Sequence, residues 1–327
     1  MDTRPLGSTG LAVTPIGLGL AAIGRPGYIT LGRGEDLAGA RTPVEMRRRS
    51  HELLDAAYAS GIRYVDAARS YGRAEEFLAS WLDDRRMAPG AVVVGSKWGY
   101  TYIADWRVGA EVNETKDHSV ATLRRQLAES RELLGAHLRL YQVHSATLES
   151  GVLDDPAVLA ELIGVREAGI VVGLSVSGPR QAEVVRRALD ARADGAAVFQ
   201  AVQATWNVLE PSVAAALDEA REAGLGVIVK EALANGRLTD RGTGPAAEVL
   251  RRIGVRHGAT VDAVAIAATL ANPWASIVLS GAVTVPQLQS NVAALGVALT
   301  PADFAELAVL AEEPDRYWAT RSALPWT

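Results

Sequence analysis

Four side chains suited to carbonyl chemistry stand at or just after the ends of three apolar, strand-like runs. Asp66 ends the run IRYVD, and Tyr71 follows in the same segment. Lys97 ends the run AVVVGSK, and His144 ends the run LRLYQVH. An acid, a phenol, an ammonium and an imidazole can together deliver a proton to a carbonyl oxygen while hydride reaches the carbon. These residues therefore indicate a reaction that interconverts a carbonyl and an alcohol.

Each of the four residues also has an ordinary structural explanation when it is taken alone. An Asp after a strand often forms a turn, and a Lys at a strand end often extends to solvent. A lone Tyr or His is commonly a packing residue. Their shared position at the ends of successive strands is what favours a catalytic interpretation.

The expected roles follow from charge. A phenol with a pKa of about 10 is a poor proton donor and acceptor at neutral pH. We expect Lys97 to lie beside Tyr71 and to lower the pKa of that phenol by stabilising the phenolate. Asp66 would pair with Lys97, because an unpaired ammonium is costly inside a protein. His144 would hydrogen-bond to the carbonyl oxygen and orient it.

Strand-like and helix-like runs alternate along the chain, which predicts a (β/α)8 TIM barrel with an N-terminal β-hairpin (about 3–14) and extra C-terminal helices. Eight such units fit a closed barrel better than an open sheet, although the spacing alone leaves a doubly wound fold open. The C-terminal strand ends of such a barrel share one face, where the four residues would meet. No linker or shift in composition divides the chain, so we expect one domain over residues 1–327. The expected strands are 15–20, 62–67, 91–97, 138–144, 171–176, 198–204, 225–230 and 276–281; the expected helices are 43–60, 74–87, 117–135, 156–169, 179–192, 211–223, 245–257, 260–271, 286–295 and 301–312.

Two aromatic segments are expected at the same face of the barrel. The long loop 98–116 follows the third strand, and the tail 314–327 ends the chain. Loops on this face shape substrate pockets, so either segment could close over the site. The expected substrate-pocket residues are Trp98, Tyr100, Trp106 and Trp326.

The composition disfavours several classes of function. The net charge of −5 argues against a nucleic-acid or anionic-membrane partner. The chain has no Cys, which excludes disulfides and thiol chemistry and favours a cytoplasmic setting. Its 5 His residues show no metal-ligand spacing, so we expect no metal site. The sequence also lacks a secretion signal and an uncharged apolar run of about 18 residues, so we expect no membrane partner.

Four motifs resemble those of the aldo-keto reductase family, and the resemblance runs from about residue 4 to residue 310. RPLGSTGLAVTPIGLG is similar to the family's N-terminal hairpin and first strand. VDAARSYG resembles its Asp-and-Tyr signature, GSKWG its lysine strand and YQVHS its histidine strand. The resemblance implies a nicotinamide-dependent oxidoreductase that acts on a small carbonyl or alcohol substrate. It also implies that Tyr71 is the general acid/base, that Asp66 and Lys97 tune it, and that His144 orients the substrate.

The resemblance further implies residues at the nicotinamide end of a cofactor site. GLSVSG places Ser175 at a matching position, although Val176 replaces the commonest Asn. VQATWN places Gln203 at a matching glutamine. Lys230 stands where the family often has a Tyr that stacks on the nicotinamide. Its ammonium could instead bind a cofactor phosphate or extend to solvent.

The segment IVLSGAVTVPQLQSN resembles the loop and helix around the adenosine end, with Gly281, Gln287 and Asn291 at matching positions. The basic residue that typically contacts the 2′-phosphate of NADP is missing. Val283 stands in its neighbourhood, and the segment has no Lys or Arg. A 2′-phosphate normally takes a charge-assisted partner. Both NADP(H) and NAD(H) therefore stay open, and NADP(H) would need a basic residue from elsewhere in the chain.

These patterns leave open the substrate, the direction of reaction, the oligomeric state and three other interpretations. If the cofactor is NAD, an NAD-dependent dehydrogenase of a sugar or other polyol becomes the better match. The chain could also be a cofactor-binding regulatory subunit with little turnover. A Schiff-base lyase could use Lys97 or Lys230, but a nucleophilic lysine must be neutral, whereas Asp66 would hold Lys97 in its charged form.

Overall fold

Eight parallel strands close into a barrel in the computed structural model, which covers residues 1–327. The strands are hydrogen-bonded in chain order, and the last one pairs with the first. This arrangement confirms the predicted (β/α)8 barrel, and every expected strand range overlaps an observed one. The barrel strands are β3 (Ile16–Gly19), β4 (Tyr64–Asp66), β5 (Val93–Trp98), β8 (Leu138–Ala146), β9 (Val171–Val176), β12 (Ala201–Thr205), β13 (Gly226–Lys230) and β14 (Ile277–Ser280).

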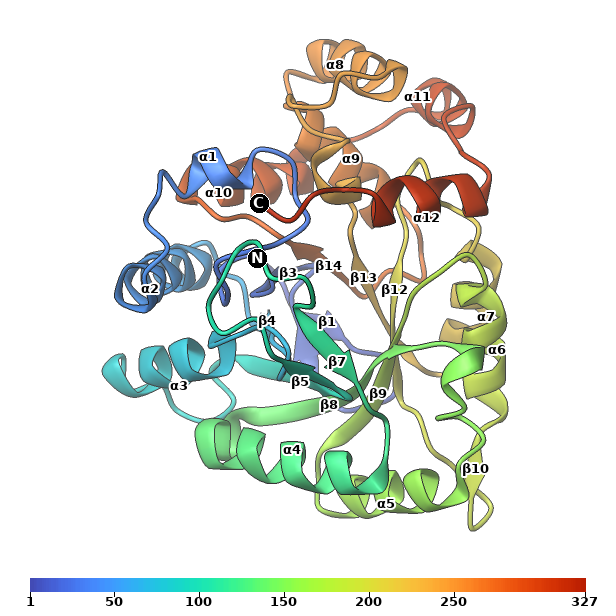
Figure 1. Ribbon diagram of the computed structural model, residues 1–327. Helices are drawn as coiled ribbons and strands as arrows, with labels where there is room; N and C mark the ends of the chain where they lie inside the picture. The colour runs from blue at the N-terminus through green and yellow to red at the C-terminus, as the bar shows by residue number, and fades with distance from the viewer.

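Helices surround the strands on all sides of the barrel (Figure 1). Each expected helix range overlaps one of the ten helices from α2 to α11. The starts carry ordinary capping signals: the Thr42 side chain accepts from the backbone N–H of Glu45, and Pro43 follows as the first helical residue. These helices are α2 (Pro43–Ala59), α3 (Ala74–Asp84), α4 (Val120–Leu134), α5 (Pro156–Glu167), α6 (Gln181–Asp190), α7 (Ala214–Glu222), α8 (Pro245–His257), α9 (Val261–Leu270), α10 (Val285–Ala293) and α11 (Pro301–Ala308).

Two helices, α1 (Arg33–Asp36) and α12 (Pro314–Ser322), have no counterpart among the expected ranges. With four residues, α1 is too short to show a helical period. In α12 the buried side chains are the adjacent Tyr317 and Trp318, so the apolar spacing of three or four residues is absent. Both helices are held by contacts distant in sequence, which a local pattern does not record.

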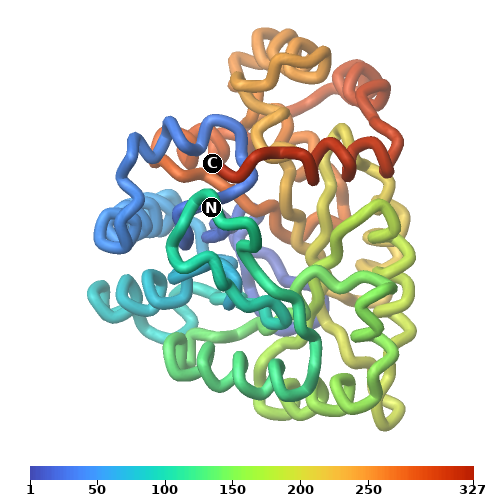
Figure 2. Tube along the Cα trace, viewed as in Figure 1, coloured from blue at the N-terminus to red at the C-terminus, as the bar shows by residue number.

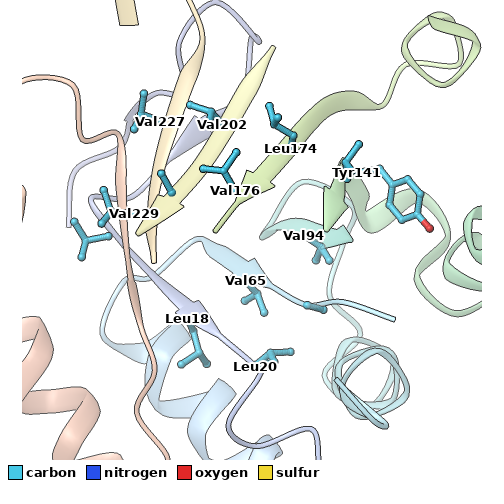
Figure 3. Packing of buried hydrophobic residues seen from close by; sticks show 14 of the residues in the cluster. Leu18, Leu20, Val65, Val94, Tyr141, Leu174, Val176, Val202, Val227 and Val229 are labelled. Atoms are coloured by element: carbon cyan, nitrogen blue, oxygen red, sulfur yellow. The ribbon is translucent and has the colours of Figure 1, made fainter. Parts of the chain in front are cut away.

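Side chains alternate along each barrel strand between an inner and an outer core. Tyr64, Val93 and Leu140 belong to the inner cluster, which the N-terminal hairpin of β1 (Arg4–Pro5) and β2 (Ala12–Val13) completes with Leu6, Leu11 and Val13. The outer cluster lies between the strands and the helices. Figure 3 shows part of it, with Leu18, Val65, Val94 and Tyr141 on four successive strands. The hairpin therefore fills the N-terminal end of the barrel, and the polar inward positions lie at the C-terminal end.

Two segments meet at the C-terminal end of the barrel. The loop after β5 forms a hairpin of β6 (Tyr100–Tyr102) and β7 (Glu114–Lys116). The C-terminal tail lies beside the segment after β3, as Figure 2 shows, and Tyr28 and Thr327 exchange backbone hydrogen bonds of 3.2 and 3.0 Å. These segments wall the mouth of the barrel. None of the helices has the length and hydropathy that a membrane crossing requires.

Candidate active site

A cavity of about 670 Å³ opens at the C-terminal ends of the strands. Asp66, Tyr71 and His144 line it, so three of the four expected catalytic residues face the same space. Lys97 does not line it but lies fully buried behind Asp66 and Tyr71. Side chains alternate between the two faces of a strand, and Asp66, Lys97 and His144 occupy positions whose side chains point into the barrel. This alternation explains why they converge. The volume lies within the range of about 300–1,000 Å³ that is typical of ligand pockets.

Asp66 and Lys97 form a buried ion pair. The Lys97 Nζ also donates to the backbone oxygen of Ala67 at 2.9 Å and lies 3.4 Å from the phenol oxygen of Tyr71. The other oxygen of the Asp66 carboxylate accepts from Tyr64 at 3.2 Å and from the Gln203 side chain at 3.0 Å. A buried pair is tolerable only when its remaining hydrogen-bonding groups are satisfied, and here they are. The pair fixes a cation beside the Tyr71 hydroxyl.

The pKa of Tyr71 is raised rather than lowered. Burial is the largest cause, the Asp66 carboxylate adds to it, and the Arg25 guanidinium opposes it. We expected Lys97 to lower this pKa, but burial of the ring dominates and the net shift is upward. Tyr71 therefore holds its proton at neutral pH.

His144 is held neutral beside Tyr71. Burial lowers its pKa well below the ordinary value, and Lys97 and Arg25 lower it further. The Nδ1 atom lies 3.2 Å from the Ser70 hydroxyl, and the ring meets the Tyr71 ring edge-on at 5.4 Å. Its backbone oxygen is 2.9 Å from the side chain of His118. A neutral imidazole fixed in this way can hydrogen-bond to a substrate oxygen without carrying charge.

The expected nicotinamide-end residues divide into two that line the cavity and one that does not. Gln203 and Lys230 line it. Ser175 is buried outside it, and its hydroxyl accepts from the backbone N–H of Ser145 at 2.8 Å. The Lys230 Nζ donates to Thr205 at 2.7 Å and to Ser177 at 3.2 Å, and burial lowers the pKa of Lys230 to about 8 although Glu231 raises it. Lys230 is therefore not a solvent-extended lysine.

Glu231 and Arg321 tie the C-terminal helix to this wall of the cavity. They form an ion pair, and both residues line the cavity. Burial alone would raise the pKa of Glu231, but Arg321 and Lys230 outweigh burial and lower it to about 2. No local pattern indicates this pair, because its members lie 90 positions apart.

Gly281, Gln287 and Asn291, the residues expected at an adenosine end, line the end of the cavity beside β14 and α10. The Asn291 side chain accepts from Ser280 at 2.7 Å and donates to Asp262 at 2.7 Å. Gln287 accepts from the backbone N–H of Val283 at 3.0 Å. These bonds fix the loop between β14 and α10.

Two charged residues that the sequence did not indicate complete this end. The Gln287 amide donates to Asp36 at 2.8 Å, and Arg241 pairs with the same carboxylate at 2.6 Å. Asp36 belongs to the unpredicted α1, and Arg241 to the loop between β13 and α8.

The residues present fit an extended dinucleotide. One end of the cavity offers Tyr71, His144, Gln203 and Lys230 around the reacting position. The other end offers hydrogen-bonding side chains and the open loop at Gly281, where an added Cβ would meet no atom within 4 Å. Gln203 and Lys230 would hold the nicotinamide half, and the loop before α10 would hold the adenosine half.

Two of the four expected pocket aromatics face the cavity. Tyr100 and Trp326 line it. Trp98 is wrong as a pocket residue: it follows the inward Lys97 by one position, so it points outward and is fully buried in the outer core. Trp106 is also wrong, because its indole donates to the backbone oxygen of Arg41 at 2.6 Å and its ring packs edge-on against Phe77.

Arg25 is a further residue of the cavity wall that the sequence did not indicate. Its guanidinium lies 4.7 Å from the centre of the Trp326 ring and 5.5 Å from that of Tyr71. It donates to Glu114 of β7 at 2.9 Å and to the backbone oxygen of Ser70 at 3.0 Å. It therefore links the β6–β7 hairpin, the tail and the segment that carries Tyr71.

Comparison with known proteins agrees with this geometry. A family model described as the aldo/keto reductase family matches residues 16–312. An aldo-keto reductase of Strobilurus tenacellus is 26% identical over 96% of this chain and 93% of its own. A pyridoxal 4-dehydrogenase of Microbacterium luteolum is 30% identical over 44% of this chain and 43% of its own.

Two solved structures share the fold. A glycerol dehydrogenase of Gluconobacter oxydans superposes with a TM-score of 0.72 at 20% identity, covering 94% of each chain. The holo form of an aldo-keto reductase from Bacillus halodurans has a TM-score of 0.70 at 21% identity, covering 96% of this chain and 97% of its own. The family match spans nearly the whole barrel and the segments that carry the four converging residues, and the chain belongs to the aldo/keto reductase family.

Proposed function

We propose that this chain interconverts a carbonyl compound and its alcohol with a nicotinamide cofactor, and that Tyr71 is the general acid/base. Family membership supports the reaction class. The observation that carries the assignment of Tyr71 is its phenol oxygen, 3.4 Å from the buried Lys97 Nζ in a cavity shared with His144. A proton donor must be placed within reach of the reacting oxygen, and Tyr71 faces the cavity with its proton in place.

The bound nicotinamide supplies or accepts the hydride. In the reductive direction the Tyr71 hydroxyl gives its proton to the carbonyl oxygen. The Lys97 ammonium then stabilises the phenolate that remains, and Asp66 keeps the cation in place. The His144 imidazole, neutral and fixed beside Ser70, donates a hydrogen bond to the substrate oxygen and orients it. In the oxidative direction the same groups take the proton from the alcohol.

The cofactor half of the cavity has matching groups. The Gln203 amide nitrogen is held by Asp66, which leaves its carbonyl oxygen for a ligand donor. Lys230 donates to Thr205 and Ser177 and lies 3.9 Å from the Glu231 carboxylate, and its ammonium would meet a cofactor oxygen in the cavity. Gly281, Gln287 and Asn291 frame the opposite end. Ser175 keeps a supporting role behind the cavity, through its bond to Ser145.

A dehydrogenase of a sugar or other polyol is the second candidate. The observation that favours it is the Arg25–Glu114 pair, which lines the cavity beside Tyr100 and Trp326. A donor and an acceptor side by side suit neighbouring hydroxyl groups, and aromatic faces suit the C–H face of a sugar. A small apolar carbonyl would leave this pair without a ligand partner.

The test is a two-part measurement on the purified protein. Binding of NADH and NADPH is followed by quenching of the protein's tryptophan fluorescence, and turnover is followed by cofactor absorbance with a panel of aldehydes, ketones, sugars and polyols. The proposal predicts binding of at least one cofactor and turnover of at least one carbonyl–alcohol pair. Binding without turnover on any member would favour a regulatory subunit, and binding of neither cofactor would refute the oxidoreductase assignment.

A further inference from the structure

We propose that Asp36 selects NAD(H) over NADP(H) by placing a fixed carboxylate at the adenosine end of the cavity. The inference rests on the proposed function and names the cofactor that the site takes. The two cofactors differ at one position, the ribose 2′ oxygen, which is a hydroxyl in NAD(H) and a phosphate ester in NADP(H). A carboxylate accepts from the hydroxyl, whereas a basic side chain is needed for the phosphate.

Asp36 is placed at this end by contacts from two other elements. Gln287, in the first turn of α10, donates to its carboxylate at 2.8 Å. Arg241 donates to both carboxylate oxygens, at 2.6 and 2.5 Å. All three residues line the cavity together with Asn291. Asp36 therefore stands where the loop that would hold the adenosine half meets the cavity.

The segment that carries Asp36 is anchored. The side chain of Arg33, in the same short helix, is fully buried and donates to the backbone oxygens of Ala22, Pro26 and Thr327, each at 2.7 Å. These bonds join α1 to the loop after β3 and to the C-terminal tail. The backbone that carries Asp36 is therefore held in place at the edge of the cavity.

The charges at this end oppose a phosphate. The carboxylates of Asp36, Asp240 and Asp262 line the cavity here, and Arg241 is the cation that lines it beside them. Burial alone would raise the pKa of Asp36, but the hydrogen bonds from Arg241 and Gln287 outweigh burial and lower it, so the carboxylate is ionised at neutral pH. A phosphate monoester carries about −1.5 to −2 charges at neutral pH and would meet like charge.

Arg241 is not free to serve a phosphate instead. Its guanidinium is bidentate to Asp36 and also donates to the backbone oxygen of Leu31 at 3.2 Å. It packs so closely on Gly32 that a Cβ added there would lie 2.4 Å from the Arg241 Nε. Segment 277–291 supplies no other Lys or Arg. Arg49 also lies nearby, but it does not line the cavity, and its guanidinium donates to the backbone oxygens of Asp36 and Leu37 at 3.2 and 3.4 Å. The cation that does line the cavity here, Arg241, is therefore committed to holding the acceptor in place.

The experiment compares dissociation constants for NADH and NADPH, measured by tryptophan fluorescence in the wild type, Asp36→Asn and Glu35→Gln. Asp36→Asn removes the charge but keeps a polar side chain of the same size. Glu35→Gln makes the same change of charge at the exposed neighbouring position, so it controls for the long-range electrostatic effect of removing one negative charge. We expect the wild type to bind NADH at least about tenfold more tightly than NADPH, and Asp36→Asn to reduce that preference by about tenfold. Glu35→Gln should leave the preference unchanged.

Circular dichroism would show whether Asp36→Asn folds. If it does not, the ratio of the NADPH and NADH dissociation constants of the wild type still tests the inference. Equal or tighter binding of NADPH by the wild type would overturn it, as would an unchanged ratio in a folded Asp36→Asn variant. Either result would leave the oxidoreductase assignment intact. Failure of the wild type to bind either cofactor would instead count against the proposed function.

Discussion

The Lys97 amine lies 3.4 Å from the Tyr71 phenol oxygen while it is ion-paired with Asp66 on its other side. In the proposed mechanism the cation is shared between the Asp66 carboxylate and the phenolate that Tyr71 becomes when it gives up its proton. This relationship would allow Tyr71 to be protonated at rest and still lose its proton to a substrate. It also makes the three residues one unit, whose members cannot be removed independently.

The first prediction concerns the buried pair. Lys97→Met leaves the Asp66 carboxylate buried without its partner, and we expect the free energy of unfolding to fall by about 3–5 kcal/mol. The double variant Asp66→Asn/Lys97→Met should recover much of that loss, because neither charge is then left alone. Turnover should remain at least about 100-fold reduced in both. Chemical denaturation and steady-state kinetics measure the two effects, and a double variant with restored turnover would exclude Lys97 from the reaction.

The second prediction concerns pH. Because the pKa of Tyr71 is raised, the phenol keeps its proton through neutral and mildly alkaline pH. Reduction, which uses the acid form, should have a kcat/KM that is flat over that range. Oxidation, which uses the phenolate, should speed up as the pH rises. Profiles measured in both directions test this, and an oxidation rate that falls with rising pH would contradict it.

The barrel and its four converging residues could be predicted because both depend on local patterns. Apolar runs of alternating type give the strands and helices, and Asp66, Tyr71, Lys97 and His144 stand in short motifs at the strand ends. The inward position of three of them then follows from the period of a strand.

Trp98 was wrongly predicted to line the pocket, and the alternation of side chains along a strand already argues against that prediction. It follows Lys97 directly, so the two side chains must leave the strand on opposite faces. Asp36, Arg25 and Arg321 show a limit of sequence patterns. Each reaches the cavity from a segment without apolar period, and its partner lies far away in the sequence, so no local pattern could indicate it.

The third prediction concerns His144. His144→Ala removes the hydrogen-bond donor proposed to orient the substrate oxygen, so kcat/KM should fall by about 100- to 1,000-fold. Cofactor affinity should change little, because the residues assigned to the cofactor are elsewhere. Ser70→Ala, which removes only the partner of the Nδ1 atom, should cause a smaller loss. Equal losses in both variants would assign the effect to positioning and count against direct contact by His144.

The fourth prediction concerns the Glu231–Arg321 pair that holds the C-terminal helix. The folded pKa of Glu231, about 2, lies below the value of about 4.3 in an unfolded chain. The folded state therefore binds fewer protons, so the pair contributes stability above about pH 4.3 and loses it as the pH falls toward 2. The difference in unfolding free energy between wild type and Glu231→Gln should shrink over that window. Glu313→Gln, at an exposed position beside the same helix, should show no such trend.

The most direct test of the account is the turnover of Tyr71→Phe, measured beside Tyr100→Phe. Both variants remove one hydroxyl from the cavity wall, but the structure joins only the Tyr71 hydroxyl to Lys97. We predict that Tyr71→Phe lowers kcat by about 100- to 10,000-fold with nearly unchanged cofactor affinity, and that Tyr100→Phe keeps most of its turnover. Retention of most of the activity by Tyr71→Phe would show that another group moves the proton and would contradict the central claim.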